Sequence, residues 1–280
     1  MILVTGVTGA VGREVARLLA AAGPVRALAR RPERVPVTER AVDVVQGDYD
    51  DRDSLDRALR GVRAAFLVTN SPTEPHDARF ATAAREAGVR HLVKLSMAAV
   101  AEPDADDLLV RVQRRNEQAI RESGPAWTLL RARTFMSNTL RWAGTIRSEG
   151  VVRALYGTSP VACVDPRDIA EVAVRVLTEP GHEGKAYSLS GPEGISAAEQ
   201  TAQLSEVLGR PLRFEELTRE QARAELLRRH PEPVAEAFLR SAERQRAGAK
   251  AHVLPTVPAL TGRAARPFRA WARDHADAFA

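Results

Sequence analysis

Near its start the chain reads Ile2-Leu3-Val4-Thr5-Gly6-Val7-Thr8-Gly9-Ala10-Val11-Gly12, an apolar run followed by three glycines spaced three residues apart. The next segment, 13–19, has the apolar period of a helix. A buried strand, a glycine turn and a helix in this order predict a site for a dinucleotide pyrophosphate, because the turn and the helix N-terminus present backbone N–H groups. Glycine turns are common, so the alternative is a turn that is only structural.

Each glycine of this stretch has its own expected role. Gly6 permits the tight turn, Gly9 lets the phosphates approach the backbone, and Gly12 lets the helix pack closely on its strand. The residues expected to contact the cofactor here are Gly6, Thr8, Gly9, Ala10, Val11 and Gly12.

Composition places the chain among ordinary globular proteins. Of its 280 residues, 44% are hydrophobic and 28% are charged, which is usual for that class. No apolar run approaches the ~20 residues that a membrane span needs, and Met1 leads directly into the first strand. We therefore expect a cytoplasmic protein without a membrane partner. Cys163 is the only cysteine, which excludes an internal disulfide, and we expect it in the core.

The formal net charge of +5 does not by itself predict nucleic-acid binding. Nearly all basic residues are arginines, and along segments such as 219–225 they alternate with acids, as on a solvated helix face. The sequence contains no basic stripe with interleaved aromatic residues and no cluster with the spacing of metal ligands. We expect a small-molecule substrate, no nucleic acid and no metal, and leave a homodimer open.

Strand and helix signals alternate along residues 1–131, which we assign to a dinucleotide-binding domain. The expected strands are 2–4, 25–29, 42–46, 64–68, 91–95 and 127–130, and the expected helices are 13–19, 54–59, 77–87 and 110–122. This order predicts an α/β fold with a doubly wound parallel sheet of the Rossmann type. Ligands are then expected over the carboxyl ends of the strands.

The rhythm changes after Arg131. Residues 132–280 are therefore predicted to form mainly a smaller, discontinuous α/β lobe that binds substrate, with some strands and helices returning to the main sheet. Asp165, Ser196 and Thr218 have the pattern of helix N-caps. The expected helices are 134–147, 166–177, 196–208 and 266–279, with another beginning near 218, and the expected strands are 161–164 and 186–189.

The end of the second expected strand bears on which dinucleotide is bound. Sites for NAD usually place a carboxylate there for the ribose 2′-hydroxyl, whereas this strand ends in Ala29-Arg30-Arg31. A guanidinium binds a 2′-phosphate through charge-assisted hydrogen bonds, so the sequence favours NADP(H) with Arg30 as its contact. The alternative is that both arginines only face water.

Polar residues follow three other expected strands. Asp48 is placed to accept from the adenine amino group, although a role in a turn or a helix cap is an equal alternative. Thr69 and Asn70 follow the fourth strand and Ser96 the fifth, so we expect them near the ribose and nicotinamide. All four are candidate cofactor-binding residues.

In this order the segments resemble the NmrA-like group of atypical short-chain dehydrogenase/reductases over essentially the whole chain. The likeness is carried by residues 4–12, 26–30 and 47–49, by Glu117, and by 127–131, 135–138, 164–170 and 184–191. The group includes NADPH-dependent quinone reductases and regulators that sense NADP(H). The resemblance implies an NADP(H)-binding fold and does not specify a substrate.

One departure from ordinary short-chain dehydrogenases concerns the proton donor. Those enzymes use a Tyr and a Lys four residues later, and the corresponding positions here are Leu109 and Gln113. Relatives in the quinone-reductase branch often carry His where Gln113 stands, and no Tyr-x-x-x-Lys occurs anywhere in the chain. The sequence therefore argues against an ordinary carbonyl reductase.

Hydride transfer to a quinone or another conjugated acceptor needs less protein acid, because the resulting anion is stabilised and solvent delivers the proton. The protein then mainly aligns the nicotinamide with the acceptor. Asn138 is the best polar candidate to orient a carbonyl oxygen, with Gln113 and Ser96 as further catalytic candidates. An apolar substrate wall is expected from Phe135, Met136 and Trp142. The alternative for Phe135 and Met136 is that they are helix core.

Three functions stay open from the sequence. We favour an NADP(H)-dependent oxidoreductase that reduces a quinone-like or conjugated small molecule by direct hydride transfer without a Tyr-Lys pair. The second is a regulatory protein that senses NADP(H) with little or no turnover, which the missing pair favours. The third is a biosynthetic enzyme for a specialised metabolite on the same fold.

Overall fold

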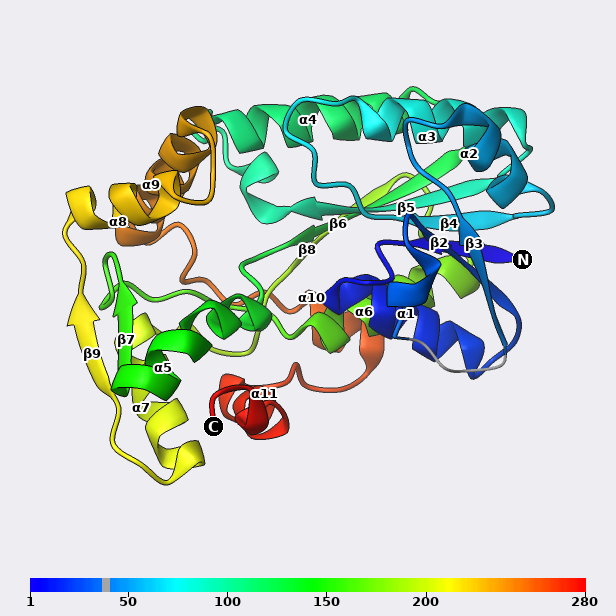
Figure 1. Ribbon diagram of the computed structural model, residues 1–280. Coiled ribbons are helices and arrows are strands. Elements are labelled where there is room, and N and C mark those ends of the chain that lie inside the picture. The colour runs from blue at the N-terminus through cyan, green and yellow to red at the C-terminus, as the bar shows by residue number, and fades with distance from the viewer. Residues whose placement is uncertain (37–40) are drawn as a thin grey trace.

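A parallel sheet forms the centre of the protein in the computed structural model, which describes residues 1–36 and 41–280 (Figure 1). Within these residues seven strands lie in the order β3-β2-β1-β4-β5-β6-β8, and every neighbouring pair is parallel. Their bounds are β1 Ile2–Thr5, β2 Val25–Ala29, β3 Val42–Gln46, β4 Ala64–Leu67, β5 His91–Met97, β6 Ala126–Ala132 and β8 Lys185–Leu189. The predicted doubly wound α/β fold is confirmed.

β1 marks the point where the strand order reverses. Ile2 pairs with Val25 of β2 on one side and with Ala64 of β4 on the other. The carboxyl end of β1, where Gly6 follows, is thus the crevice in which ligands of doubly wound sheets bind.

Helices cover both faces of the sheet, which explains why its strands are nearly continuous apolar runs. One face carries α1 Ala10–Ala20, α6 Pro166–Thr178 and α10 Thr256–Thr261, and the other carries α2 Arg52–Leu59, α3 His76–Glu86 and α4 Leu108–Arg121 (Figure 1). Successive side chains of a strand point to opposite faces, so Leu3 packs into one core and Val4 into the other. Among the described residues, no helix has the length and apolar character needed to cross a membrane.

A second lobe lies beyond the carboxyl ends of the strands, at the left of Figure 1. It contains a two-stranded parallel sheet of β7 Val151–Ala154 and β9 Arg213–Glu216, which the sequence did not predict. Its core includes Ile146, Phe268 and Trp271. The helices of this lobe are η3 Met136–Trp142, α5 Ala143–Glu149, α7 Ala197–Leu208, α8 Arg219–Leu227, α9 Glu232–Arg246, α11 Phe268–Asp274 and η4 Ala276–Ala278.

Three expected elements of the second lobe differ from the structure. Residues 134–147 are not one helix, because Phe135 is extended and bridges to Val164 before η3 and α5 begin. Residues 161–164 form only isolated bridges and no strand, although Cys163 is buried as predicted. The tail 266–279 divides into α11 and η4.

Three predicted helix starts are confirmed. The Asp165 side chain accepts from the N–H of Arg167, and Pro166 follows it as the first residue of α6. Ser196 and Thr218 each form a capping box with the third residue of their helix. Capping boxes are local hydrogen-bond patterns, which is why the sequence alone can predict them.

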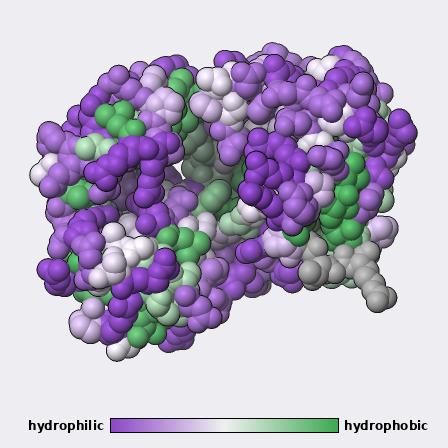
Figure 2. All heavy atoms as spheres, in the orientation of Figure 1, coloured by the Kyte–Doolittle hydropathy of each residue, from purple (hydrophilic) through white to green (hydrophobic). Residues whose placement is uncertain are grey.

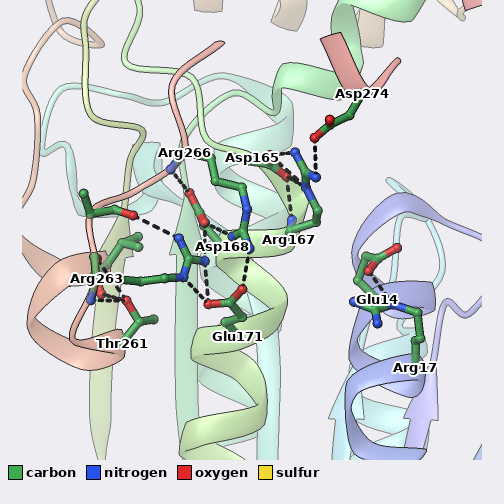
Figure 3. Close-up of polar contacts among 12 residues, drawn as sticks. Glu14, Arg17, Asp165, Arg167, Asp168, Glu171, Thr261, Arg263, Arg266 and Asp274 are labelled. Carbon is green, nitrogen blue, oxygen red and sulfur yellow. Dashed lines mark hydrogen bonds and ion pairs between the residues drawn. The ribbon is translucent and has the colours of Figure 1, made fainter. Parts of the chain in front are cut away.

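The chain returns from the second lobe to the main sheet through α6, β8 and α10. Two carboxylates of α6 hold the segment that follows α10 (Figure 3). Asp168 is 0% exposed and accepts from Nη2 of Arg263 and from the backbone N–H of Arg266, both at 2.7 Å. Glu171 accepts from Nε of Arg263 and Nη2 of Arg266, also at 2.7 Å. The boundary expected at residue 131 stays a prediction.

Candidate functional site

The turn between β1 and α1 is built from glycines because side chains do not fit there. Gly6 has a φ of +66°, and its carbonyl accepts from the N–H of Gly9 at 2.9 Å. A Cβ on Gly12 would lie 2.3 Å from that carbonyl oxygen, so α1 packs this closely only with glycine. Gly9 and Thr8 are exposed at the outer side of the turn.

The N-terminus of α1 offers three backbone amides to a ligand. Gly9 is the N-cap and has no side chain to accept from them, and the first turn carries no acidic residue. Among the described residues, the N–H groups of Ala10, Val11 and Gly12 have no acceptor. Orphan amides at the positive end of a helix dipole fit a pyrophosphate. The turn therefore fits NADP(H).

Arg30 follows β2 at the same edge of the sheet, two residues beyond Leu28, which pairs with Thr5. Its side chain is exposed and, within residues 1–36 and 41–280, forms no ion pair. The neighbouring Arg26 differs, because it pairs with Asp43 at 2.8 Å. The placement of Arg30 is compatible with a 2′-phosphate contact, and that role stays a prediction.

Asp48 holds a turn. Its Oδ1 accepts from the N–H of Asp50 at 3.1 Å, and its own N–H donates to Ser54 Oγ at 3.0 Å. The N-cap of α2 is Asp51 instead, which accepts from the N–H of Ser54 at 3.1 Å. The turn role is therefore present, and the contact of Asp48 with adenine stays a prediction.

The carboxyl end of β4 rests on a buried ion pair. Lys94 and Asp77 lie 3.0 Å apart and are at most 1% exposed. Lys94 Nζ also donates to Thr69 Oγ1 at 2.8 Å, and that hydroxyl donates to Asp77. The Thr69 side chain is thus part of this buried hydrogen-bonded group, whereas the neighbouring Asn70 is exposed. Direct cofactor contacts by both residues stay predictions.

Ser96 of β5 is held by Glu117 of α4. It is 7% exposed, and its hydroxyl donates to Oε1 of Glu117 at 2.7 Å. Glu117 also accepts from Arg131 at 2.6 Å. Burial by itself would raise the pKa of Glu117, but the hydrogen bonds from Arg131 and Ser96 lower it below the usual value. The Ser96 proton is therefore engaged by a carboxylate.

Gln113 presents an unsatisfied acceptor. It lies on α4, and its buried Oε1 has no hydrogen-bond donor among the described residues. Buried polar atoms normally have partners, so an orphan of this kind fits a donor from a bound ligand. Its catalytic role stays a prediction, because no contact shows which donor that is.

In the short helix η3, side chains three residues apart lie on the same side, as expected for a 3-10 helix. Met136, Thr139 and Trp142 share one side and are at most 5% exposed. Asn138 and Arg141 share another side and are exposed. Met136 and Trp142 both belong to the core of the second lobe, which supports the core alternative for Met136. Asn138 keeps its place as a candidate, and the substrate contact of Trp142 stays a prediction.

The remaining candidate of the wall is Phe135, which is half-buried and packs partly on the core of the first sheet face. Its bridge to Val164 fixes the backbone where β6 passes into η3. Phe135 thus has a structural role in the described contacts, and its contact with substrate stays a prediction.

The carboxyl ends of the central strands face a hollow. Figure 2 shows this hollow between the main sheet and the second lobe, with apolar side chains at its base and hydrophilic ones around it. This is the edge at which doubly wound sheets bind their ligands. Within residues 1–36 and 41–280, no group of three or more His, Cys, Asp or Glu could hold a metal ion.

Two side chains of this region have roles that the sequence reasoning missed. Lys94 was detectable, because a lysine inside an apolar strand indicates a buried ion pair. The role of Glu117 depends on its ion pair with Arg131 of β6, a contact between two different elements that leaves no local pattern in the sequence.

Comparisons with known proteins agree with this geometry. The model of the NmrA-like family matches residues 1–254. A (4-alkanoyl-5-oxo-2,5-dihydrofuran-3-yl)methyl phosphate reductase from Streptomyces griseus is 71% identical over 280 residues, which cover 100% of this chain and 99% of that protein. An NAD(P)H azoreductase from Xenophilus azovorans is 41% identical over 284 residues, with 100% and 99% covered.

A solved structure extends the likeness to both lobes. The NADPH-dependent quinone oxidoreductase from Escherichia coli, in complex with NADPH, superposes with a TM-score of 0.84 at 26% identity. The match covers 98% of this chain and 99% of that one. The arrangement of sheet and second lobe is thus shared with a structure that holds the cofactor.

Proposed function

The chain belongs to the NmrA-like family, and from this premise we propose that it is an NADP(H)-dependent reductase of a conjugated, phosphorylated lactone. The oxidoreductase class and the cofactor follow from the family and its reductase members. The identity of the substrate goes beyond what the family shows. It is supported by the 71% identity, over the full length, to the reductase of a 4-alkanoyl-furanone methyl phosphate.

Such a substrate has a reactive carbon–carbon double bond. The bond lies in the lactone ring, and one of its carbons carries both the ring carbonyl and the alkanoyl carbonyl. When bound, NADPH would supply a hydride to the other carbon, which bears the methyl phosphate substituent. The electron pair of the double bond then spreads over both carbonyl oxygens, and a proton from solvent adds to the carbon between them. The ring double bond becomes a single bond.

The residues of the site suit this chemistry. Because two carbonyl groups stabilise the anion, the reaction needs no strong acid, which is consistent with Leu109 and Gln113 at the positions of the missing Tyr and Lys. Asn138 is exposed, and in this proposal its amide donates to one carbonyl oxygen. The buried Oε1 of Gln113 can accept from a donor of the bound complex. In this proposal the protein mainly aligns the two reactants.

The test is an assay of the purified protein with the synthetic furanone phosphate and NADPH. We expect NADPH consumption to match product formation one to one, with the product reduced at the ring double bond and both carbonyls intact. A panel of quinones and azo dyes run beside it separates this substrate class from those named for other relatives.

Two results would count against the proposal in different ways. Faster turnover of quinones or dyes than of the furanone phosphate would keep the reductase and remove the lactone substrate. Absence of turnover with every acceptor, despite tight NADPH binding by calorimetry, would favour a protein that senses NADP(H).

A further inference from the structure

A group of basic side chains lies where the second lobe meets the main sheet, at the place where α9 runs beside the N-terminal end of α4 (Figure 1). Its two carboxylates are Glu102, which follows the short helix η2 Ala98–Ala101, and Asp107, the N-cap of α4. We call the group the basic cluster. Its cations come from four segments: Arg114 of α4, Arg133 directly after β6, Arg244 of α9, and Lys250 between α9 and α10.

Two arginines of the basic cluster have carboxylate partners that are close but poorly aligned. Nη2 of Arg244 lies 2.7 Å from Oδ2 of Asp107, and its Nε lies 3.4 Å from Oε2 of Glu102. All four of these atoms are buried, and among the described residues none has a hydrogen bond. Nε of Arg133 is also buried without an acceptor. Buried polar atoms normally have partners, so the cluster has hydrogen-bonding capacity that the protein itself does not use.

The other two cations form no ion pair among the described residues. Arg114 donates to the backbone carbonyl of Glu102 at 2.6 Å, and Lys250 Nζ donates to the hydroxyl of Ser241 at 2.7 Å. The cluster thus holds two positive charges more than its two carboxylates balance. Cations that are partly removed from water without counter-ions cost free energy, which an incoming anion recovers.

The basic cluster is open to solvent on one side. The side chains of Arg133 and Arg244 are 11% and 17% exposed. Nη2 of Arg133 and Nη1 of Arg244 form no hydrogen bond among the described residues, and neither belongs to the buried atoms of the cluster. An anion that approaches from solvent can therefore reach a terminal nitrogen of each arginine.

The position of the basic cluster agrees with the expected reaction centre. Arg133 directly follows the carboxyl end of β6, at the edge where doubly wound sheets bind their ligands. Asp107 precedes Leu109 by two residues, about 3 Å of helix, and Leu109 stands at the position of the missing Tyr. In the proposed substrate, three bonds separate the phosphorus from the carbon that receives the hydride. A phosphate in the cluster is thus compatible with a ring that lies at this part of the site.

We propose that the basic cluster binds the phosphate group of the substrate through Arg133, Arg244 and Lys250, and thereby selects a phosphorylated lactone over its alcohol. This inference rests on the proposed function for the identity of the anion. Two guanidinium groups and an ammonium group offer charge-assisted hydrogen bonds to phosphate oxygens, which a neutral hydroxyl cannot replace. The site is separate from Arg30, which follows β2 and is the expected contact of the cofactor's own 2′-phosphate.

The first test measures the preference for the furanone phosphate over its dephosphorylated alcohol, as the ratio of the two kcat/KM values. Lys250→Met removes a charge that forms no ion pair among the described residues, and Arg133→Gln removes a second charge. We expect each variant to lower the preference roughly ten- to a hundredfold, because the phosphate loses a charged hydrogen-bond partner. Arg240→Ala is the matched control, since Arg240 is an exposed arginine one helical turn before Arg244 and should not affect the preference.

A structural role of the basic cluster would give a different result. Loss of activity with both substrates at an unchanged ratio would overturn the assignment, and so would a ratio that stays at the parent value with full activity. Thermal unfolding identifies a variant that no longer folds, and the ratio measured with the other variant then decides.

The second test does not depend on turnover. Protein saturated with NADP⁺, so that the cofactor phosphate sites are filled, is titrated with n-butyl phosphate by calorimetry. Binding by the parent and Arg240→Ala that is at least about tenfold weaker in Lys250→Met supports the anion site even if the furanone phosphate is not reduced. Binding that is equal in all three proteins, or absent from the parent, would refute the site. Failure of turnover alone would refute only the proposed function.

Discussion

Arg30 is the side chain on which cofactor choice is expected to depend. We predict that Arg30→Ala weakens NADPH binding about ten- to a hundredfold and leaves NADH binding nearly unchanged, because only NADPH has a 2′-phosphate. Calorimetry with both nucleotides measures the difference. Arg31→Ala is the matched control, since Arg31 is also exposed and stands one residue further along. Equal losses for both nucleotides would show that Arg30 does not contact the 2′-phosphate.

Substitutions at Gly9 and Gly12 should distinguish an effect on nucleotide binding from an effect on folding. The backbone of Gly9 has φ −96° and ψ 169°, which valine can adopt, so Gly9→Val should fold and lose nucleotide binding. Gly12→Val should also lose stability, because its Cβ would lie 2.3 Å from the Gly6 carbonyl oxygen. Thermal unfolding and calorimetry test the pair. Normal nucleotide binding by Gly9→Val would remove the pyrophosphate assignment.

Proton transfer should depend little on any one side chain. We expect Ser96→Ala and Gln113→Ala each to lower kcat by about tenfold or less, because a true general acid contributes ~10²–10⁴-fold. Asn138→Ala should do more harm than either, since it removes the proposed carbonyl partner. A loss of three decades in Ser96→Ala or Gln113→Ala, with NADPH affinity intact, would instead reveal a proton relay and refute the positioning mechanism.

Lys250 should make stability depend on pH. Burial lowers its pKa from 10.5 to about 8, although Ser241 accepts from its Nζ at 2.7 Å. Between these values the unfolded chain holds a proton that the folded protein has lost, so stability rises with pH across this window. Denaturant unfolding should show that rise in the parent and not in Lys250→Met. Parallel curves from pH 7 to 10.5 would contradict the assignment.

At the level of elements, α6 depends on two arginines that follow α10. Asp168→Ala would leave Arg263 and Arg266 without their buried acceptor and should destabilise the protein by roughly 3–5 kcal/mol. Arg175→Ala is the control on the same helix, because it breaks an exposed pair with Glu179 and should cost at most ~1 kcal/mol. Urea unfolding measures both. A similar small cost for the two variants would mean that this network does not hold the segment.

The elements also show what the sequence can and cannot predict. Strands of the main sheet and the caps at Asp165 and Ser196 follow from apolar runs and local hydrogen bonds, which a sequence displays directly. The segment 134–147 was wrong as one helix, because the bridge from Phe135 to Val164 overrides its helical spacing. The candidate site divides in the same way: the glycine turn was predictable, whereas the surroundings of Ser96 depend on Glu117 and Arg131, which are distant in sequence.

On the scale of the whole molecule, a hollow separates the main sheet from the second lobe (Figure 2). The main sheet lies on one side of it and the second lobe on the other (Figure 1). The second lobe is itself discontinuous, because β7 and β9 pair across 62 residues of sequence, Val151 to Arg213. Contacts over such separations leave no local pattern, so the lobe's sheet could not be predicted.

The ion pairs between α6 and the arginines beyond α10 have a consequence for the chain during its synthesis. Asp168 is translated 95 residues before Arg263 and 98 before Arg266. At ~5–20 residues per second, α6 then waits about 5–20 s for the partners of its buried carboxylate. Until then the carboxylate of Asp168 stays solvated in the nascent chain on the ribosome. The sheet face that α1 and α6 cover is then also incompletely packed. Native packing of this face is therefore expected to be a late event, and the interval before it is when a holding chaperone would bind.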